Sequence, residues 1–478
     1  MIDVVVSVVV REERETNSFF LSIMQKWKET TRDASTRARC GVIDVSIDEG
    51  TRTARTRTPC ALVPTSRGEH ATLTRDVLDD VERRLTRAFS QRPDKDKADD
   101  PTTSERMFGC VLVGSHFVRK SERGYKRKRK NNGDEDDNDD SARRSDALER
   151  CPPKRRLAIG HYRDATYFGL NTQTRTSKSS NALMCETPYG QKTLGPEAYM
   201  RGWRGDAHAA CALADEHAGW ESEKKSKSSA IVTVGWLDAC VEEIRKMESG
   251  GGDAKTTSLW GVVLGGGYER VREECALKVA ERDASLDGYV LGGFYAGEDE
   301  TTREACVETV LRHVPEGKPR YFPGVMTIED VVGHIERGVD VFDAAWASET
   351  AARGRAFCFP ISPDADVDTD AIDSTPCAFS GRDAYSINVW STAYKTDFVP
   401  FLGAKDRCAC PACADHTRAY VHHLLQAHEM TADVLLEAHN LYHLASFFAA
   451  ARAAIENGSW VDFAEFHRAY ARKARGVK

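Results

Sequence analysis

Three cysteines and one histidine toward the end of the chain have the composition of a metal site. Cys408, Cys410 and Cys413 are separated by one and two residues, and His439 follows on a later segment. Three thiolates and one imidazole can close a tetrahedral shell, which is the arrangement that zinc prefers. A closed shell leaves no position for water, so we predict one structural zinc ion. An iron–sulfur cluster is disfavoured, because its fourth ligand is more usually cysteine.

The short cysteine spacings allow one loop to supply three of the ligands. His439 must then come from a helix, which we expect to begin near Thr417 and to bend or break before Val434. The other histidines of this region are expected at surface or packing positions rather than in the metal shell: His416, His422, His423, His428 and His443.

Upstream of the cysteines, short apolar runs alternate with amphipathic segments. The predicted strands are 259–264, 288–294, 321–325 and 339–345, and the helices between them are 268–284, 301–313 and 328–337. The alternation extends backward through strands at 209–214 and 230–234 and a helix at 236–247. This order predicts an α/β protein built as a (β/α)₈ TIM-type barrel, with a doubly wound sheet as the alternative.

Two aspartates are candidates for chemistry because of their place relative to these strands. Active sites of such barrels lie on the loops that follow the carboxyl ends of the strands. Asp215, Leu264, Gly292-Gly293 and Asp343 occupy that position. A carboxylate there can act as a nucleophile or as an acid/base. An aspartate at a strand end also often caps the following helix, and both roles are open at this stage.

Composition restricts the class of protein. Fourteen cysteines spread over 478 residues, with no secretory leader, indicate reduced core thiols and a metal cluster rather than disulfides. The opening MIDVVVSVVV is too short to span a bilayer, so we predict a cytoplasmic protein with no integral membrane segment. A formal net charge of −7 argues against diffuse electrostatic binding of nucleic acid. Any RNA contact should be local or supplied by a partner.

Breaks in the apolar pattern predict the domain organisation. Residues 1–35 are expected to be an N-terminal extension without a fold, and 36–400 the barrel. The highly charged segment 119–156 is predicted to be a disordered insertion, because it cannot bury enough apolar surface to offset its ordering entropy. Residues 401–478 would hold the zinc-binding subdomain, inserted near the C-terminus, and the C-terminal helices. Shorter polar segments at 221–229, 248–257 and 362–376 are predicted to be surface insertions.

Several motifs together resemble one family. The string C-x-C-x₂-C, followed by HTRAYVHHLL and then LLEAHN, closely resembles the zinc subdomain of tRNA-guanine transglycosylases. SLWGVVLGGGYERVREE, LDGYVLGGFYAGE, KPRYFPGVMTIEDVVGHIERGVDVFD and GRAF resemble consecutive barrel segments of that family in the same order. With KTLGPEAYM and ALADE, the likeness covers residues 190–460. It implies the same barrel and the same four zinc ligands.

The resemblance also implies a chemistry. In that family an aspartate attacks the ribose of the wobble guanosine, guanine leaves and queuine enters, with a second aspartate as general acid/base. Asp343, in GVDVFD, stands where the nucleophile belongs, and Asp215, in ALADE, stands where the family contacts the base. Gly292-Gly293 matches the wall of the base pocket.

Three departures from the family pattern indicate that catalysis has been lost. The family's D-S-G-G-F-Q segment, which carries the second catalytic aspartate, has no counterpart, since the stretch before KTLG reads NALMCETPYG. The family's V-Q-G-G reads V-L-G-G at 263–266, so an amide that reads the base becomes an isobutyl group. The family's P-T-R reads A-S-E at 347–349, which reverses the charge that faces tRNA phosphate.

This pattern fits the family's eukaryotic non-catalytic accessory subunit, in which Asp343 and Asp215 would be relics. The resemblance then implies a heterodimer with a catalytic queuine tRNA-ribosyltransferase subunit, tRNA bound through the complex, and a peripheral place at the mitochondrial outer membrane. The alternatives are a self-sufficient transglycosylase that uses Asp343 as nucleophile, and a zinc-stapled interaction scaffold unrelated to tRNA modification.

The apolar segment LYHLASFFAAARAAI is a candidate for the contact with the catalytic subunit, because its apolar content exceeds what one buried helix face requires. The alternative is that the same side chains pack in the chain's own core, and the sequence does not favour either use. The residues concerned are Leu441, Leu444, Phe447, Phe448 and Ala451.

Overall fold

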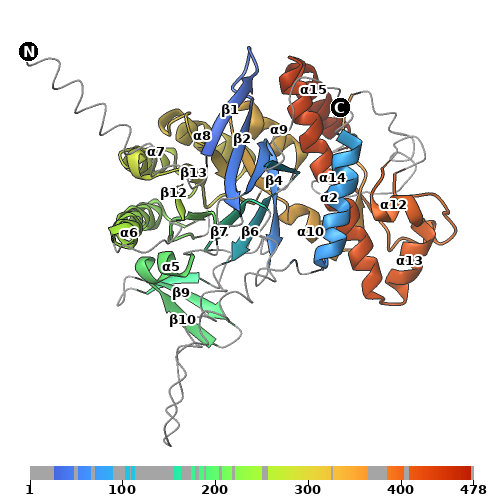
Figure 1. Cartoon of the computed structure of the whole chain (residues 1–478), viewed down its shortest axis with the longest axis horizontal. Helices are drawn as coiled ribbons and strands as arrows, with labels where there is room; N and C mark the ends of the chain where they lie inside the picture. The colour runs from blue at the N-terminus through green and yellow to red at the C-terminus, as the bar shows by residue number, and fades with distance from the viewer. Residues whose placement is uncertain are drawn as a thin grey trace, which may run out of the picture.

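Figure 1 shows the computed structural model of the chain, in which helices surround a central barrel of strands and further helices pack on one side of it. The structure describes residues 26–47, 52–65, 70, 72–89, 103–107, 109–113, 156–162, 174–177, 182–187, 190–203, 207–217, 221–249, 257–324, 327–363, 385–402 and 408–474.

Eight of the described strands close a parallel barrel in the order β11-β12-β13-β14-β15-β4-β6-β7. Their bounds are β4 Cys60–Thr65, β6 Gly109–Val113, β7 Ala158–His161, β11 Ala209–Cys211, β12 Ser258–Val263, β13 Gly288–Leu291, β14 Arg320–Phe322 and β15 Val341–Asp343. Every residue of β4, β7 and β11–β15 is buried, as expected when side chains fill the barrel and helices cover it. The TIM-type barrel is confirmed, and the doubly wound alternative is wrong.

Helices alternate with the strands around the barrel, as the pattern from residue 258 onward predicted. They are α5 Pro196–Trp203, α6 Glu223–Ser249, α7 Glu269–Ala280, α8 Glu300–His313, α9 Ile328–Glu336 and α10 Ala345–Ala352, with the 3-10 turn η4 at Asp283–Ser285. The strands β11, β13, β14 and β15 are shorter than the predicted ones, whereas β12 has the predicted length and begins one residue earlier.

The strand predicted at 230–234 is wrong, because these residues lie in the middle of α6. The run AIVTV is rich in β-branched residues, which favour strands. Its burial nevertheless follows helical spacing: Ala230 and Thr233 are buried, whereas Ile231 is 54% exposed. The segment 221–229 is not an insertion either, since α6 begins at Glu223. The buried positions of its first turns are the polar residues Ser226 and Ser229, so no apolar periodicity marks the helix in the sequence.

Smaller sheets flank the barrel. The strands β1 Lys26–Arg32, β2 Arg39–Ile47, β3 Arg52–Thr58 and β5 Thr103–Arg106 form one sheet, β8 Thr174–Ser177, β9 Ala182–Thr187 and β10 Gly190–Leu194 form a second, and β16 Arg355–Phe357 pairs with β17 Ser386–Asn388. Residues 26–35 therefore differ from the expected extension without a fold, because β1 pairs along its length with β2. Arg39 ties this sheet to the barrel through Asp340, with two buried hydrogen bonds of 2.8 and 2.7 Å.

The C-terminal part is helical. It contains η6 Thr392–Tyr394, α12 Pro411–Asp415, α13 Arg418–Gln426, α14 Met430–Glu456 and α15 Trp460–Ala474. The helix α2 Arg75–Phe89 lies beside α14 (Figure 1). The predicted break before Val434 is confirmed, since α13 and α14 are separate helices with His428 in the left-handed region between them.

The apolar segment of α14 packs inside the chain rather than against a partner. Leu441, Leu444, Phe447, Phe448 and Ala451 are at most 3% exposed. Phe448 stacks on Phe342 of the barrel, with ring centroids 5.4 Å apart. The use of these five side chains as a subunit contact is therefore wrong. The helix is apolar all round because α2, α10, α15 and the barrel surround it.

The insertion predicted at 119–156 lies outside the described residues except for Arg156, which is buried and hydrogen-bonded to Glu82 of α2 at 2.6 Å. The polar segments at 248–257 and 362–376 also fall mostly outside them. None of the described helices combines the length and the apolar content that crossing a bilayer requires.

Candidate metal centre and barrel mouth

The structure brings together the four predicted metal ligands. Cys408 precedes α12, Cys410 caps its first turn, Cys413 lies within it and His439 comes from α14. Their ligand atoms all lie within 4.8 Å of one another. His439 Nδ1 is 3.4 Å from the sulfurs of Cys410 and Cys413 and 3.8 Å from that of Cys408.

These distances fit a tetrahedral zinc site. An ion bound to sulfur at about 2.3 Å and to nitrogen at about 2.05 Å, with tetrahedral angles, would place sulfur and nitrogen about 3.6 Å apart. Hydrogen bonds with Cys408 and Cys410 lower the pKa of Cys413, which favours the thiolate that a metal requires. The donor set and its spacing therefore fit Zn²⁺ with no position left for water.

The orientation of His439 is fixed by a backbone carbonyl. Its Nε2 lies 2.9 Å from the carbonyl oxygen of Phe357 in β16. A carbonyl can only accept, so Nε2 must carry the proton and Nδ1 keeps the lone pair that faces the thiols. The neighbouring Asn440 accepts from the Phe357 N–H at 2.8 Å and donates to the carbonyls of Ala347 and Arg355. These hydrogen bonds fasten α14, which carries His439, to β16 and α10.

The other histidines of this region are not ligands, as predicted. His422 and His443 are buried and hydrogen-bonded to the backbone carbonyls of Val389 and Phe359. His416 stacks on Tyr420, and His423 and His428 are exposed.

At the carboxyl end of the barrel, Asp343 is used by the backbone. Its Oδ2 accepts from Gly324 N–H at 2.5 Å, and its Oδ1 accepts from Ala345 N–H, at the start of α10, at 3.1 Å. Asp343 is 3% exposed. Asp343 thus holds two consecutive strand–helix connections together and accepts the N–H of the first residue of α10, although the N-cap position itself is Ala344.

Asp215 is likewise engaged. Its Oδ2 accepts from Ser229 Oγ at 2.8 Å and lies 3.8 Å from Lys225 Nζ, both on α6. Its backbone N–H donates to Thr233 Oγ1 at 3.0 Å. The residue is 5% exposed. These contacts fasten the loop after β11 to α6 and leave Asp215 poorly accessible to a ligand.

Two functional positions were not singled out from the sequence. Glu216, next to Asp215, accepts from Gly293 N–H at 2.7 Å. Arg272 of α7 is completely buried and donates to four carbonyls of the loops after β12 and β13: those of Val263, Gly266, Gly292 and Gly293. Its guanidinium lies over Phe294, and burial lowers its pKa from the usual value. A buried arginine on an otherwise polar stretch gives no periodic signal in a sequence.

At 347–349, Ala347 is buried and the two polar side chains are half-buried. Ser348 donates to Glu437 of α14 at 2.7 Å, and Glu349 pairs with Arg353 on its own helix. Glu437 is 1% exposed and lies 3.2 Å from Nε2 of His70, in the segment between β4 and α2. This stretch of α10 is therefore tied to the metal-bearing helix.

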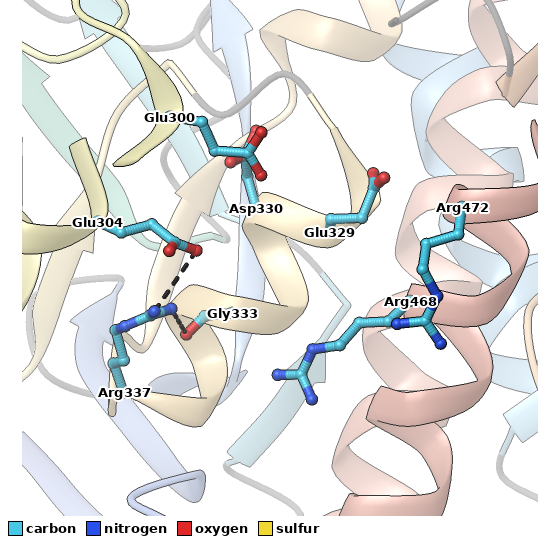
Figure 2. A pocket seen from close by; sticks show the side chains of 8 residues that line it. All are labelled: Glu300, Glu304, Glu329, Asp330, Gly333, Arg337, Arg468 and Arg472. Atoms are coloured by element: carbon cyan, nitrogen blue, oxygen red, sulfur yellow. Dashed lines mark hydrogen bonds and ion pairs between the residues drawn. The ribbon is translucent and has the colours of Figure 1, made fainter. Parts of the chain in front are cut away.

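A separate cavity of about 400 Å³ lies outside the barrel between α8, α9 and α15. Figure 2 shows its two walls of opposite charge, with carboxylates on α8 and α9 facing arginines on α15. Its lining residues are Glu300, Glu304, Glu329, Asp330, Gly333, Arg337, Arg468 and Arg472. Many of these charges pair with the chain's own groups: Arg337 with Glu304, Arg468 with Glu336 and Asp330 with Arg303. We therefore assign no function to this cavity.

Comparison with known proteins identifies relatives over most of the described chain. A family model for queuine tRNA-ribosyltransferase matches residues 165–474. The chain is 30% identical to a queuine tRNA-ribosyltransferase of Lachnospira eligens over 275 residues, which are 57% of this chain and 65% of the relative.

Relatives with a different role in their names match equally well. The chain is 31% identical to the queuine tRNA-ribosyltransferase accessory subunit 2 of Xenopus tropicalis over 268 residues, covering 52% of this chain and 62% of the relative. For accessory subunit 2 of Danio rerio the identity is 31%, covering 51% and 60%. The chain thus spans less than two thirds of the length of these relatives, and identity alone does not separate the two roles.

Proposed function

The chain belongs to the queuine tRNA-ribosyltransferase family, and we propose that within it the chain is the non-catalytic accessory subunit of a heterodimeric enzyme. The enzyme would exchange guanine for queuine at the wobble position of tRNAs with GUN anticodons, which are those for aspartate, asparagine, histidine and tyrosine, and so give queuosine. Catalysis would come from the partner subunit.

The observation that carries this proposal is the engagement of Asp343. A nucleophile must approach the ribose carbon with a free oxygen lone pair and be reachable from solvent. Here each carboxylate oxygen accepts one backbone N–H group, which makes the remaining lone pairs less nucleophilic, and the residue is 3% exposed, so a ribose carbon has little access to it. The sequence offers no D-S-G-G-F-Q segment for the acid/base, and Leu264 stands where an amide should read the base.

The four metal ligands would hold one structural zinc ion per chain. The ion would link the loop of Cys408, Cys410 and Cys413 to α14, and through His439 to β16. This arrangement shapes the C-terminal surface and needs no exchangeable ligand.

The contact with the catalytic subunit is proposed to lie on that surface rather than on α14. Five of the large apolar side chains exposed in the described chain fall between residues 390 and 430, near the metal ligands: Trp390, Phe398, Val399, Tyr420 and Met430. Phe398 is 74% exposed and Met430 81%. A concentration of exposed apolar side chains in one subdomain is typical of a protein–protein interface. A cytoplasmic location at the mitochondrial outer membrane stays a prediction.

A base-exchange assay tests the function. Labelled guanine in tRNA should not be released by the chain alone, whereas release should occur when a catalytic paralogue is added and should exceed that of the paralogue alone. Release by the isolated chain would instead support a self-sufficient enzyme. No effect on the paralogue, together with no association, would support the scaffold alternative.

Association is tested separately by size-exclusion chromatography with the paralogue. Phe398→Glu combined with Tyr420→Glu should abolish co-elution, because unpaired charges would enter an apolar contact. Val461→Glu on α15 is the matched control, since Val461 is 51% exposed and lies on a helix that carries none of these five residues. Loss of co-elution in the control as well, or retention in the double variant, would place the interface elsewhere.

A further inference from the structure

The four metal ligands differ in how far solvent reaches them. Cys410 and His439 are fully buried, and Cys413 is 8% exposed. Cys408 is only half-buried and lies beside the exposed Ala409. The other cysteines whose side chains the structure describes, outside the metal centre, are all buried. Of these thiols, Cys408 is therefore the one that a small molecule in solution reaches first.

The donor set makes the sulfur of Cys408 reactive toward oxidants. Metal binding requires the thiolate form of cysteine, and the thiolate is also the form that peroxides oxidise. Three thiolates bound to one Zn²⁺ leave the group with a net negative charge, which keeps electron density on the sulfurs. The sulfurs of Cys410 and Cys413 lie within 4.8 Å of that of Cys408, so a second thiol is in place to react with an oxidised first one.

Of the two neighbouring thiols, Cys413 is the better second reactant. The sulfur of Cys410 caps α12 by accepting the N–H of Cys413 at 3.2 Å. Movement of this sulfur toward Cys408 would break the cap, whereas movement of the Cys413 side chain leaves it in place. Cys413 is also the more exposed of the two. We expect a disulfide between Cys408 and Cys413.

We propose that Cys408 makes the metal centre a switch that responds to hydrogen peroxide. The thiolate sulfur of Cys408 attacks one peroxide oxygen, the O–O bond breaks and hydroxide leaves, so the sulfur is oxidised to a sulfenic acid and the peroxide is reduced. The thiolate of Cys413 then attacks this sulfur, the S–O bond breaks, a second hydroxide leaves and the disulfide forms. Cys410 and His439 alone do not close the shell that Zn²⁺ requires, so the ion is released.

The metal centre is connected to the exposed apolar side chains proposed above as the contact with the catalytic subunit. The helix α12, which carries Cys413, is followed closely by α13. At the start of α13 the backbone N–H groups of residues 418 and 419 donate to carbonyls of the segment 397–399, both at 2.8 Å. That segment contains the exposed Phe398. Loss of the ion should loosen α12 and this surface, so the inference deepens the proposed accessory role and rests on it for this consequence.

Zinc release from the isolated chain is the first test. The zinc-loaded chain is treated with hydrogen peroxide, and the freed metal is followed with a chromophoric chelator. The wild type should release about one zinc ion per chain, and reductant with added Zn²⁺ should reload it. Peptide mapping should find Cys408 joined to Cys413. Dimedone added together with the peroxide should label Cys408, because dimedone reacts with sulfenic acids.

Two variants separate Cys408 from the rest of the chain. Cys408→His keeps four ligands without the exposed thiolate, so its zinc release should be slower by about tenfold or more. Cys358→Ala is the matched control, because Cys358 is a buried non-ligand at 9% exposure, and it should release zinc like the wild type. Zinc retained by the wild type, or released equally fast by Cys408→His, would overturn the proposal. If Cys408→His binds no zinc, dimedone on the wild type decides, and labelling of Cys410 or Cys413 before Cys408 would overturn it.

Size-exclusion chromatography with the catalytic paralogue tests the consequence. The chain is oxidised first, and catalase removes the peroxide before the paralogue is added. The reduced, zinc-loaded chain should co-elute with the paralogue, the oxidised chain should not, and Cys408→His should co-elute after the same treatment. Co-elution of the oxidised, zinc-free wild type would overturn the switch. Failure of the reduced chain to co-elute would instead count against the accessory role, while zinc release and the disulfide are decided on the isolated chain.

Discussion

Asp343→Asn separates a structural aspartate from a nucleophile. Asparagine has nearly the same shape, but one carboxylate oxygen becomes an NH₂ group. Either orientation places that NH₂ against a backbone N–H, of Gly324 or of Ala345, so one of the two bonds is lost. The remaining bond also loses its charge assistance.

The size of the effect follows from these contacts. Loss of one hydrogen bond to a charged group costs about 1.5–3 kcal/mol, and a buried N–H left without a partner adds about 1–3 kcal/mol. We expect the free energy of unfolding to fall by roughly 2–4 kcal/mol, since the two terms overlap. For a chain of this size that is a fall in apparent Tm on the order of 2–4 °C.

The variant should nevertheless support base exchange by the complex with the catalytic paralogue, measured well below its Tm. Asp340→Asn is the matched control, because Asp340 lies at the start of the same strand and is buried, hydrogen-bonded to Arg39 and to the backbone N–H of Arg320. Both variants should lower stability and leave exchange within a few-fold of wild type. A hundredfold loss confined to Asp343→Asn, about 2.7 kcal/mol of barrier, would refute the reasoning and return this residue to catalysis.

Three further outcomes are expected. Cys410→Ser should lower both the zinc content by elemental analysis, from about one per chain, and the thermal stability, because structural zinc contributes folding energy; unchanged zinc would exclude this ligand set. Burial lowers the pKa of His334 and of His467 to about 3, below the unfolded value of about 6.5. The free energy of unfolding is therefore largest above pH 6.5. As the pH drops from 6.5 towards 3, each of the two residues lowers it by about 1.4 kcal/mol per pH unit. Denaturant midpoints should fall between pH 7 and 5, and less so in His467→Phe; an equal slope would contradict the assignment. Arg272→Met should cost about 3 kcal/mol or more in a denaturant titration, because it leaves buried carbonyls without donors, whereas Arg270→Met, on the exposed face of the same helix, should cost little.

The sequence predicted the parts of the fold that repeat. From residue 258 onward each strand is a short apolar run and each helix an amphipathic one, so the order of elements was readable and the barrel followed from it. The four metal ligands were readable for a different reason, because cysteine and histidine at these spacings have few other uses. Both predictions depended on local patterns.

The errors arose where tertiary packing overrides local pattern. The run at 230–234 favours a strand by composition, yet it is helical because α6 buries small polar residues on one face. The apolar excess of α14 suggested a partner, yet the chain itself surrounds the helix. Glu216 and Arg272 were missed because their role consists of hydrogen bonds to backbone groups of other loops, which no sequence pattern records.

The departures from the family pattern at 347–349 have a structural use. At 347–349 the loss of the expected cation looked like a simple defect in RNA contact. In the fold, Ser348 donates to the buried Glu437, which lies two residues before the metal ligand His439. In the same region, the side chain of Asn440 donates a hydrogen bond to the carbonyl oxygen of Ala347.

The helix α10, which follows Asp343, is therefore tied by hydrogen bonds to the metal-bearing helix α14. Asp343 likewise accepts the N–H of the first residue of α10, and Glu216 accepts the N–H of Gly293. These polar groups form hydrogen bonds within the chain, and buried polar groups that are paired in this way stabilise the fold. The accessory role proposed above requires a docking surface for a catalytic partner, and a rigid barrel and metal subdomain supply one at low entropic cost.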